Sequence, residues 1–289
     1  ETHGMLLVVG FIGTLIALER ATALKRWYGY LAPALLGIGG ILLVTDPVPL
    51  AVAKAVLVAG ATAFTAVYIP LWRRRYDPGL LVQLLATGFA LAATVLWLGG
   101  VDFARLLPWL LAFIVLTIAA ERVELAITLG PRAGGRLLVH AWLVAVALLI
   151  GLANAQIGAI ALGLALLALT LWLFRHDIAR RTIRATGATR YMAACMLGSY
   201  FWLAIAAAVL VLASPAGFPA AQPAYDAVAH GILLGFAMSM IMAHATTILP
   251  AVLHMSVPYR AAVWARAVLL HASLVLRIWI GDGLGIRWA

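Results

Sequence analysis

The sequence has few charged residues. Asp, Glu, Lys and Arg make up only 10% of its 289 residues, whereas an ordinary soluble domain contains roughly 25%. Apolar residues account for 65% of the chain, so there is too little polar surface to cover a water-soluble globule. This balance excludes a soluble fold and predicts an all-α, polytopic transmembrane helical bundle.

The sequence also lacks paired cysteines and familiar catalytic motifs. Cys195 is the only cysteine, which excludes an internal disulfide and a paired-cysteine metal site. Nothing matches a P-loop, a nucleophile elbow, a zinc-protease motif or a dinucleotide fingerprint, so no catalytic residue is assigned. The formal charge of +10 does not indicate nucleic-acid binding here, because the basic residues lie in short connectors between apolar runs, where they orient a membrane protein.

Ten apolar runs can cross roughly 30 Å of hydrocarbon as helices. The expected spans are Gly4–Leu18, Tyr28–Val44, Leu50–Trp72, Gly79–Leu98, Leu106–Leu129, Leu137–Asn154, Ile157–Phe174, Tyr191–Ala213, Ala227–Ile248 and Ala261–Ile280. Because all connectors are short, we expect residues 1–289 to form a single integral membrane domain in contact with lipid.

The charges of the connectors alternate along the chain. Odd-numbered connectors carry most of the Lys and Arg, such as Arg73 to Arg75, whereas even-numbered ones carry Asp46, Asp102 and Asp226. The positive-inside rule then places residue 1 on the outer, periplasmic side of a bacterial inner membrane.

The first span is short and lacks a start methionine, and the chain stops soon after the tenth span. We therefore expect both native ends to be missing, with twelve spans in a full protein.

Two spans begin alike. Residues 3–7 read HGMLL and residues 230–234 read HGILL. An ancestral parallel repeat and a chance match both remain open as explanations.

Histidines within spans give the clearest functional signal, because an ionisable group in hydrocarbon needs a partner or a task. His230 and His244 are fourteen residues apart, which in a helix places them about 40° apart in azimuth and roughly 21 Å apart along the axis. This spacing is typical of helices that hold two stacked haems in membrane cytochromes. The alternative is that both histidines are hydrogen-bonded to neighbouring helices.

The depth of each histidine suggests its partners. His3 matches His230 near the outer face, so the two could bind one iron between them. His271 lies near the middle of its span and could serve either site. Towards the inner side, His244 is at the depth of His140 and of Glu19, Glu121 and Glu124. These residues are candidates for a second metal site or a proton path.

Glu121 and Glu124 are three residues apart and share a helix face. Arg122 points elsewhere and could pair with Glu19 of another helix. Three readings stay open: a structural Arg–Glu cluster, a carboxylate ligand set for a hard metal, or a proton entry path. Met240 lies four residues before His244, and a thioether with an imidazole suits copper(I), although methionine is also a common core filler.

Three passages together resemble the NnrS-like family. They are His3-Gly4-Met5 continuing to Gly10-Phe11 and Glu19-Arg20, then residues 120–124 (AERVE), and then His230 through Gly235-Phe236 to His244 and Pro250. The resemblance implies binding of haem b and of copper, a link to nitric oxide and denitrification, and His3 and His230 as ligands. More remotely, the chain is similar to the catalytic subunits of haem-copper oxidases.

The sequence departs from that family in two places. Where the family has a His-x-His-Glu-Met pattern, this chain reads Glu1-Thr2-His3-Gly4-Met5. The adjacent histidine pair of an oxygen-reducing centre is absent, which argues against terminal-oxidase activity.

Three alternative functions stay open. The leading one is a haem-binding protein for electron transfer or nitric oxide metabolism, with copper as an optional second metal. The second is a proton-coupled transporter that uses the buried carboxylates. The third is a non-catalytic subunit that accompanies other membrane or cytochrome subunits of a respiratory complex.

Overall fold

The computed structural model describes residues 2–125, 130, 132–214, 222–245 and 259–282. Within these ranges the chain is helical and contains no strand. Nine described segments are long and apolar enough to cross a membrane: Thr2–Leu24, Leu50–Arg75, Pro78–Leu98, Phe103–Glu124, Ala133–Ala153, Ala155–His176, Gly187–Ala213, Pro223–Ala245 and Val263–Ile280. The predicted all-α polytopic bundle is confirmed, and nine of its ten expected spans have the length needed.

The second expected span is shorter than the sequence suggests. Helix α3 covers only Leu31–Leu42, a rise of about 18 Å against the roughly 30 Å of a hydrocarbon core. It follows a 3₁₀ turn at Trp27–Tyr30, and it ends where the amide of Thr45 donates to the carbonyl of Leu42 just before the Asp46-Pro47 turn. Turns at both ends, which hydropathy does not detect, therefore shorten the apolar run.

The chain divides into two compact units. The first unit comprises Glu1–Glu124 with Gly134–Ala141, and the second comprises Leu125–Ala133 with Trp142–Ala289. The two HG-x-LL segments, which begin at His3 and His230, lie in different units. The proposed repeat between them stays a prediction.

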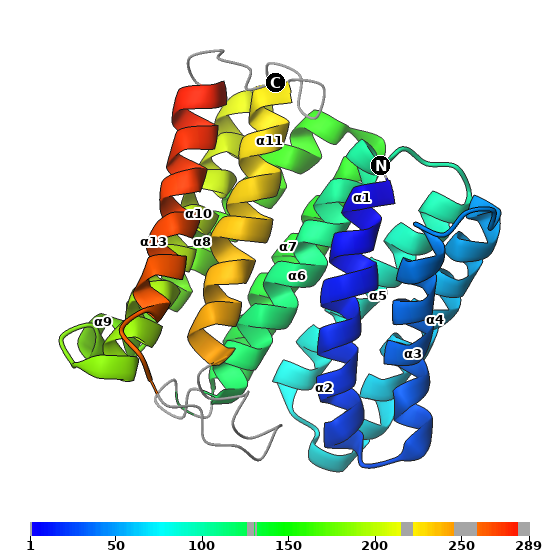
Figure 1. The fold of residues 1–289 in the computed structure, drawn as a ribbon, viewed down its shortest axis with the longest axis horizontal. Helices are drawn as coiled ribbons and strands as arrows, with labels where there is room; N and C mark the ends of the chain where they lie inside the picture. Colours follow the sequence, from blue (N-terminus) through cyan, green and yellow to red (C-terminus); the bar gives the residue numbers. More distant parts are fainter. Residues whose placement is uncertain (1, 126–129, 131, 215–221, 246–258, 283–289) are drawn as a thin grey trace. The chain divides into compact units, whose positions relative to one another are not determined.

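Close backbone contacts hold the first unit together. In Figure 1, α2 (Thr14–Leu24), α3 and α4 (Leu50–Arg75) run side by side, and α5 (Pro78–Leu98) packs against α4. The π-helical segment η1 (Leu6–Gly13) crosses α3 where a Cβ on Gly10 would lie 3.0 Å from the Cα of Gly40. Side chains at these positions would push the helices apart.

Basic side chains bind backbone carbonyl groups near both ends of α4 in the first unit. Arg74, at the end of α4, donates from Nη1 to the carbonyl of Leu24 at the end of α2, at 3.0 Å. The basic connectors after the first and third spans therefore meet at one end of this unit. Towards the other end of α4, Lys54 donates from Nζ to the carbonyl of Trp97 at 2.9 Å and lies 4.4 Å from the centroid of its ring.

The second unit is built around α10 (Gly187–Ala213). This helix packs against α8 (Ala155–His176), α11 (Gln222–His230), the π-helical segment η5 (Gly231–Met238) and α13 (Val263–Val275). Trp202 of α10 is almost completely buried, and a Cβ on Gly235 would lie 2.4 Å from its Cγ. A glycine at this position therefore lets η5 approach the indole ring.

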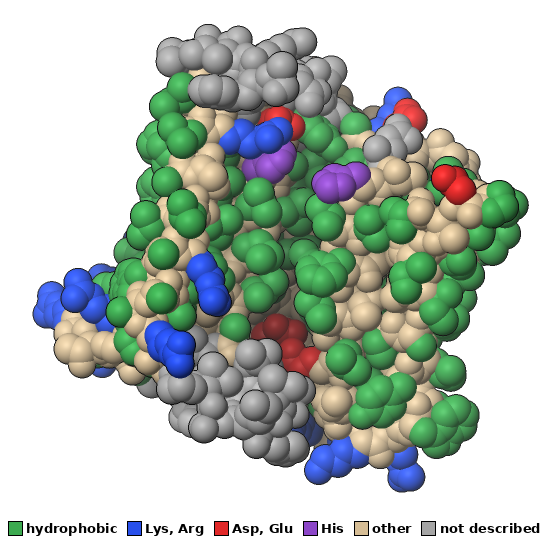
Figure 2. Space-filling view, viewed as in Figure 1, with side chains coloured by type: hydrophobic (Ala, Val, Ile, Leu, Met, Phe, Trp, Pro, Cys, Tyr) green, Lys and Arg blue, Asp and Glu red, His purple; other side chains and the backbone are tan. Residues whose placement is uncertain are grey.

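Two further long helices are α6 (Phe103–Leu125), which is largely buried, and α7 (Ala133–Ala153). Large apolar side chains such as Leu149 and Leu212 are exposed, and hydrophobic side chains cover much of the helix surfaces on the face in Figure 2. Exposed leucines at this density suit lipid rather than water. The chain is a multi-pass membrane protein.

Candidate functional site

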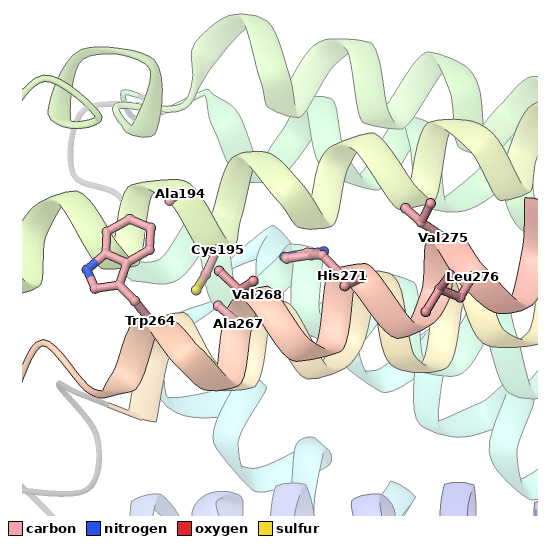
Figure 3. A pocket seen from close by; sticks show the side chains of 9 residues that line it. Ala194, Cys195, Trp264, Ala267, Val268, His271, Val275 and Leu276 are labelled. Atoms are coloured by element: carbon pink, nitrogen blue, oxygen red, sulfur yellow. The ribbon is translucent and has the colours of Figure 1, made fainter.

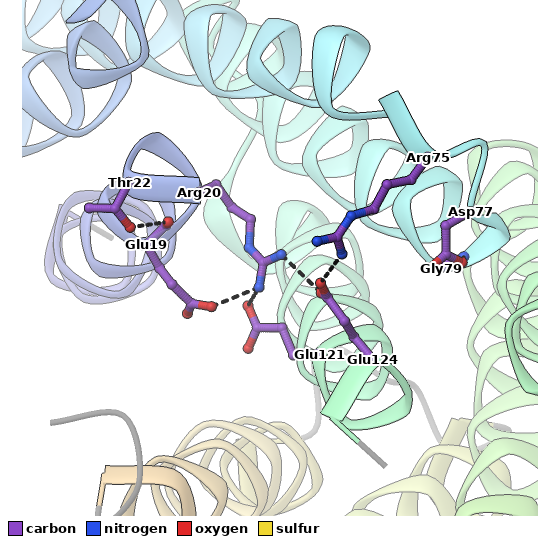
Figure 4. Close-up of polar contacts among 8 residues, drawn as sticks. All are labelled: Glu19, Arg20, Thr22, Arg75, Asp77, Gly79, Glu121 and Glu124. Carbon is purple, nitrogen blue, oxygen red and sulfur yellow. Dashed lines mark hydrogen bonds and ion pairs between the residues drawn. The ribbon is translucent and has the colours of Figure 1, made fainter. Parts of the chain in front are cut away.

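A buried guanidinium lies at the centre of the main polar cluster of the first unit. Arg20 of α2 is 6% exposed. Its Nη2 atom lies 2.7 Å from Glu19 Oε1 and 3.7 Å from Glu121 Oε1, and its Nη1 atom lies 3.0 Å from Glu124 Oε2. Figure 4 shows the three carboxylates converging on this side chain. One cation therefore holds three acids from two helices.

Helix geometry brings these acids together. Glu121 and Glu124 are one turn apart on α6 and both reach Arg20, which confirms the expected shared face. Arg75, at the end of α4, adds a second cation, with Nη1 3.4 Å from Glu124 Oε1. The cluster is therefore at the basic end of the unit, where three helices terminate.

The arginine that contacts Glu19 at 2.7 Å is its sequence neighbour, Arg20. The pair expected between Arg122 and Glu19 stays a prediction. Arg122 is itself buried, at 6% exposure. Sequence reasoning missed Arg20, Arg75 and Tyr68, a fully buried tyrosine of α4 that lies in the electrostatic environment of Arg20.

The arrangement favours proton chemistry over metal binding. A hard cation would have to take the position that the Arg20 guanidinium fills, because Arg20 already binds the carboxylates. No group of three or more His, Cys, Asp or Glu side chains in the described part of the chain has metal-binding geometry.

Glu121 Oε1 and the Tyr68 hydroxyl are buried without a hydrogen-bond partner among the described residues. Such groups can accept or release a proton.

His230 is the histidine whose geometry best suits ligation. Its Nδ1 atom lies 2.9 Å from the carbonyl oxygen of Asp226, one turn earlier on α11. A carbonyl can only accept, so Nδ1 carries the proton, and in the neutral ring the lone pair is on Nε2. The carboxylate of Asp226 pairs with Arg277 at 2.8 Å. This orientation of the ring by a backbone carbonyl is common for metal-binding histidines.

A widened helix follows each histidine that opens a span. The π-helical segment η5 begins directly after His230, and η1 begins three residues after His3. Segments of π-helix are rare and occur frequently at functional sites. His3 is exposed on α1 (Thr2–Met5), and it lies in the first unit while His230 lies in the second. Their pairing across one iron therefore stays a prediction.

His271 has a different environment. Its Nδ1 atom accepts a hydrogen bond from Trp202 Nε1 at 2.8 Å. An indole nitrogen can only donate, so the proton of the neutral imidazole is on Nε2. That edge lies against α10, where a Cβ on Gly198 would be 3.0 Å from Nε2. Both nitrogens are thus engaged or covered, and His271 suits ligation less well than His230.

His271 also lines a groove of about 550 Å³ between α10 and α13 (Figure 3). The other lining residues include Cys195, Trp264 and Val268. The surface is almost entirely apolar, as expected where acyl chains pack against a helix pair.

The remaining predicted site residues are placed but not brought into one site. His140 is half-buried on α7 in the first unit, whereas Met240, which is buried, and His244, which is half-buried, lie in helical residues 239–245 of the second. The proposed inner site of His244, His140 and the glutamates spans both units, so it stays a prediction.

Comparisons with known proteins add a family but no activity. No curated protein and no solved structure matches the chain. A family described as "Domain of unknown function (DUF8744)" matches residues 1–289. The chain therefore belongs to the DUF8744 family.

Proposed function

We propose that this chain is a haem-binding membrane protein of electron transfer or nitric oxide metabolism, in which His230 Nε2 would hold the iron. The observation that carries the proposal is the hydrogen bond from His230 Nδ1 to the Asp226 carbonyl, which leaves Nε2 with its lone pair. The His230 and His3 segments also carry the resemblance to the NnrS-like family.

The same local hydrogen bond occurs at His176, whose Nδ1 lies 2.8 Å from the carbonyl of Trp172. The bond alone is therefore not specific. His176, however, is exposed at the end of α8 beside several arginines. His230 is half-buried inside an apolar span, one turn after the Asp226 that pairs with Arg277. An imidazole in that position needs a partner, and His176 provides a matched control.

The role of the protein in this proposal is to hold and orient the group. When bound, haem would supply one-electron chemistry at its iron. The Asp226 carbonyl keeps the His230 ring in one tautomer, and the Arg277–Asp226 ion pair ties α11 to η6 (Leu276–Asp282). Copper is proposed at the Met240 and His244 pair, where a thioether and an imidazole are one turn apart.

The test is the visible spectrum of the purified protein together with its iron and copper content. We expect a Soret band in the wild type, loss of most of the bound haem in His230→Ala, and an unchanged spectrum in His176→Ala. A His3→Ala variant tests the second ligand in the same way. A wild-type protein with neither a Soret band nor iron or copper would refute this function.

The proposed location is a bacterial inner membrane with the residue 1 end in the periplasm. The support is the gathering of basic connectors at one end of the first unit, where Arg74 caps Leu24. Partner cytochrome or other respiratory subunits belong to the same proposal, and co-purification in fixed stoichiometry is its measurement.

A second function, proton-coupled transport, is favoured by the Arg20 cluster. Its described contacts match three carboxylates with two guanidinium groups, Arg20 and Arg75. Glu121 Oε1 is buried without a hydrogen bond among the described residues. We propose Glu121 as the group that takes up the transported proton.

Proton flux into proteoliposomes loaded with a pH-sensitive dye tests this second function. Under a potassium diffusion potential, we expect wild-type flux above that of empty liposomes and a fall of at least tenfold in Glu121→Gln, since an amide does not titrate. Asp46→Asn, which changes an exposed acid outside the cluster, is expected to leave the flux unchanged. Wild-type flux equal to that of empty liposomes would rule out an open proton path through Glu121.

A further inference from the structure

The connector between α8 and α10 forms a cationic pocket of about 480 Å³. Its lining includes Arg175, His176, Asp177, Arg180, Arg181 and Arg184. We propose that this pocket binds the phosphate headgroup of an anionic phospholipid. This proposal is independent of the haem and proton functions, because it uses none of their residues.

A buried acid gives the connector a defined shape. Asp177 is 5% exposed, its Oδ1 accepts from the backbone amide of Ala179 at 2.8 Å, and its Oδ2 accepts from the Tyr200 hydroxyl at 2.6 Å. The first bond satisfies the first backbone amide of the short helix α9 (Ala179–Thr182), and the second attaches the connector to α10. Basic residues that only orient a span in the membrane need no such anchoring. The hydrogen bonds of Asp177 therefore indicate that the connector has a defined shape, as a binding pocket requires.

The positive charges of the pocket arginines are not neutralised by acidic side chains in the described part of the chain. Among the residues that the structure describes, no ion pair involves Arg175, Arg180, Arg181 or Arg184. The Arg180 guanidinium lies 5.1 Å from the ring centroid of Phe174 and donates to the Arg175 carbonyl at 3.4 Å. Four cations around one anchored carboxylate make a site for a polyvalent anion.

Phosphate is the anion that this geometry fits. Guanidinium groups bind phosphate oxygens in pairs, with better geometry than ammonium groups. The pocket begins where the apolar helix α8 ends, next to Phe174, which is 41% exposed, so it lies at the depth of lipid headgroups. Basic pockets at helix ends on the cytoplasmic side are known to take anionic headgroups. The phosphate that the pocket binds is therefore the headgroup phosphate of a lipid in the surrounding membrane.

Lipid retention in nanodiscs made from equal amounts of phosphatidylcholine and phosphatidylglycerol tests the site. Native mass spectrometry of the released protein counts the phosphatidylglycerol that remains bound. We expect the Arg181→Gln/Arg184→Gln double variant to retain it at least tenfold more weakly than the wild type, since each interfacial arginine contributes several-fold to binding. The double variant Arg26→Gln/Arg73→Gln removes the same charge from exposed positions outside the pocket and is expected to behave as the wild type.

The Tyr200→Phe variant tests whether lipid binding depends on the shape of the pocket or only on its positive charge. This variant keeps every charge but removes the hydroxyl that anchors Asp177, so we expect weaker phosphatidylglycerol retention with unchanged phosphatidylcholine. Equal losses in the pocket and control double variants would overturn the proposal. So would displacement of the lipid by millimolar inorganic phosphate, because the pocket would then take a free anion.

Discussion

Replacement of Arg20 by methionine is expected to lower the free energy of unfolding by about 3 kcal/mol, the lower end of the range for breaking a buried ion pair. Methionine fills a similar volume but leaves Glu19, Glu121 and Glu124 facing one another without their shared cation. The lower end applies because Glu19 and Glu124 side chains are about one-third exposed, at 36% and 32%, and water screens part of their repulsion.

Unfolding of the purified protein in detergent, followed by circular dichroism, measures this change. Arg26→Met removes an exposed arginine from the same end of the first unit and is expected to be nearly neutral. Adding Glu121→Gln to Arg20→Met should restore part of the loss, because it removes one of the three repelling charges. Equal stability of Arg20→Met and Arg26→Met would show that the cluster contributes nothing to the free energy of unfolding.

Gly60→Val is the second large effect that we expect. A Cβ on Gly60 would lie 2.9 Å from the backbone nitrogen of Leu36, and a Cβ on Gly39 would lie 2.7 Å from the Leu57 side chain. Helices α3 and α4 therefore meet almost backbone to backbone, and a side chain at Gly60 must separate them. Overpacking of this kind costs about 1–3 kcal/mol, and we expect the upper half of that range because backbone atoms cannot rotate away.

Gly88→Val is the matched control for this change. A Cβ on Gly88 of α5 meets nothing within 4 Å, so the substitution is expected to leave the thermal midpoint of unfolding almost unchanged, whereas Gly60→Val lowers it by several degrees. Both midpoints come from the same detergent-solubilised preparation. A similar fall in both variants would mean that valine itself, rather than the helix contact, is responsible.

The membrane fold follows from composition and hydropathy because a spanning helix satisfies all its own backbone hydrogen bonds. Nine spans could be predicted in this way. The shortening of the Tyr28–Val44 span could not, since it depends on the 3₁₀ turn at Trp27–Tyr30 and on the turn before Pro47. Hydropathy reports where a segment is apolar and does not report where its helix stops.

The carboxylate cluster was partly predictable. The shared face of Glu121 and Glu124 follows from their spacing alone. The role of Arg20 does not, because successive residues on a helix point about 100° apart, which argues against a pair between Glu19 and Arg20. The long arginine side chain nevertheless reaches Glu19 Oε1 at 2.7 Å. Side-chain length near the end of a helix can outweigh the direction of the Cα–Cβ bond.

The other contacts that the sequence did not predict join residues that are far apart in the chain. His271 and Trp202 are 69 positions apart in sequence, and periodicity carries no information about such a pair. The same holds for Asp226 and Arg277, which are 51 positions apart in sequence and which the structure joins at 2.8 Å.

Lys54 has a consequence for how the protein enters the bilayer. Its ammonium group is stabilised by the Trp97 carbonyl at the negative end of the α5 dipole and by the Trp97 ring. Those partners exist only once α5 lies beside α4, and only Tyr76 and Asp77 separate the two helices. Translocation of α4 alone would expose an unpaired cation to the lipid, so the helical hairpin, rather than the single helix, is the favourable unit of insertion.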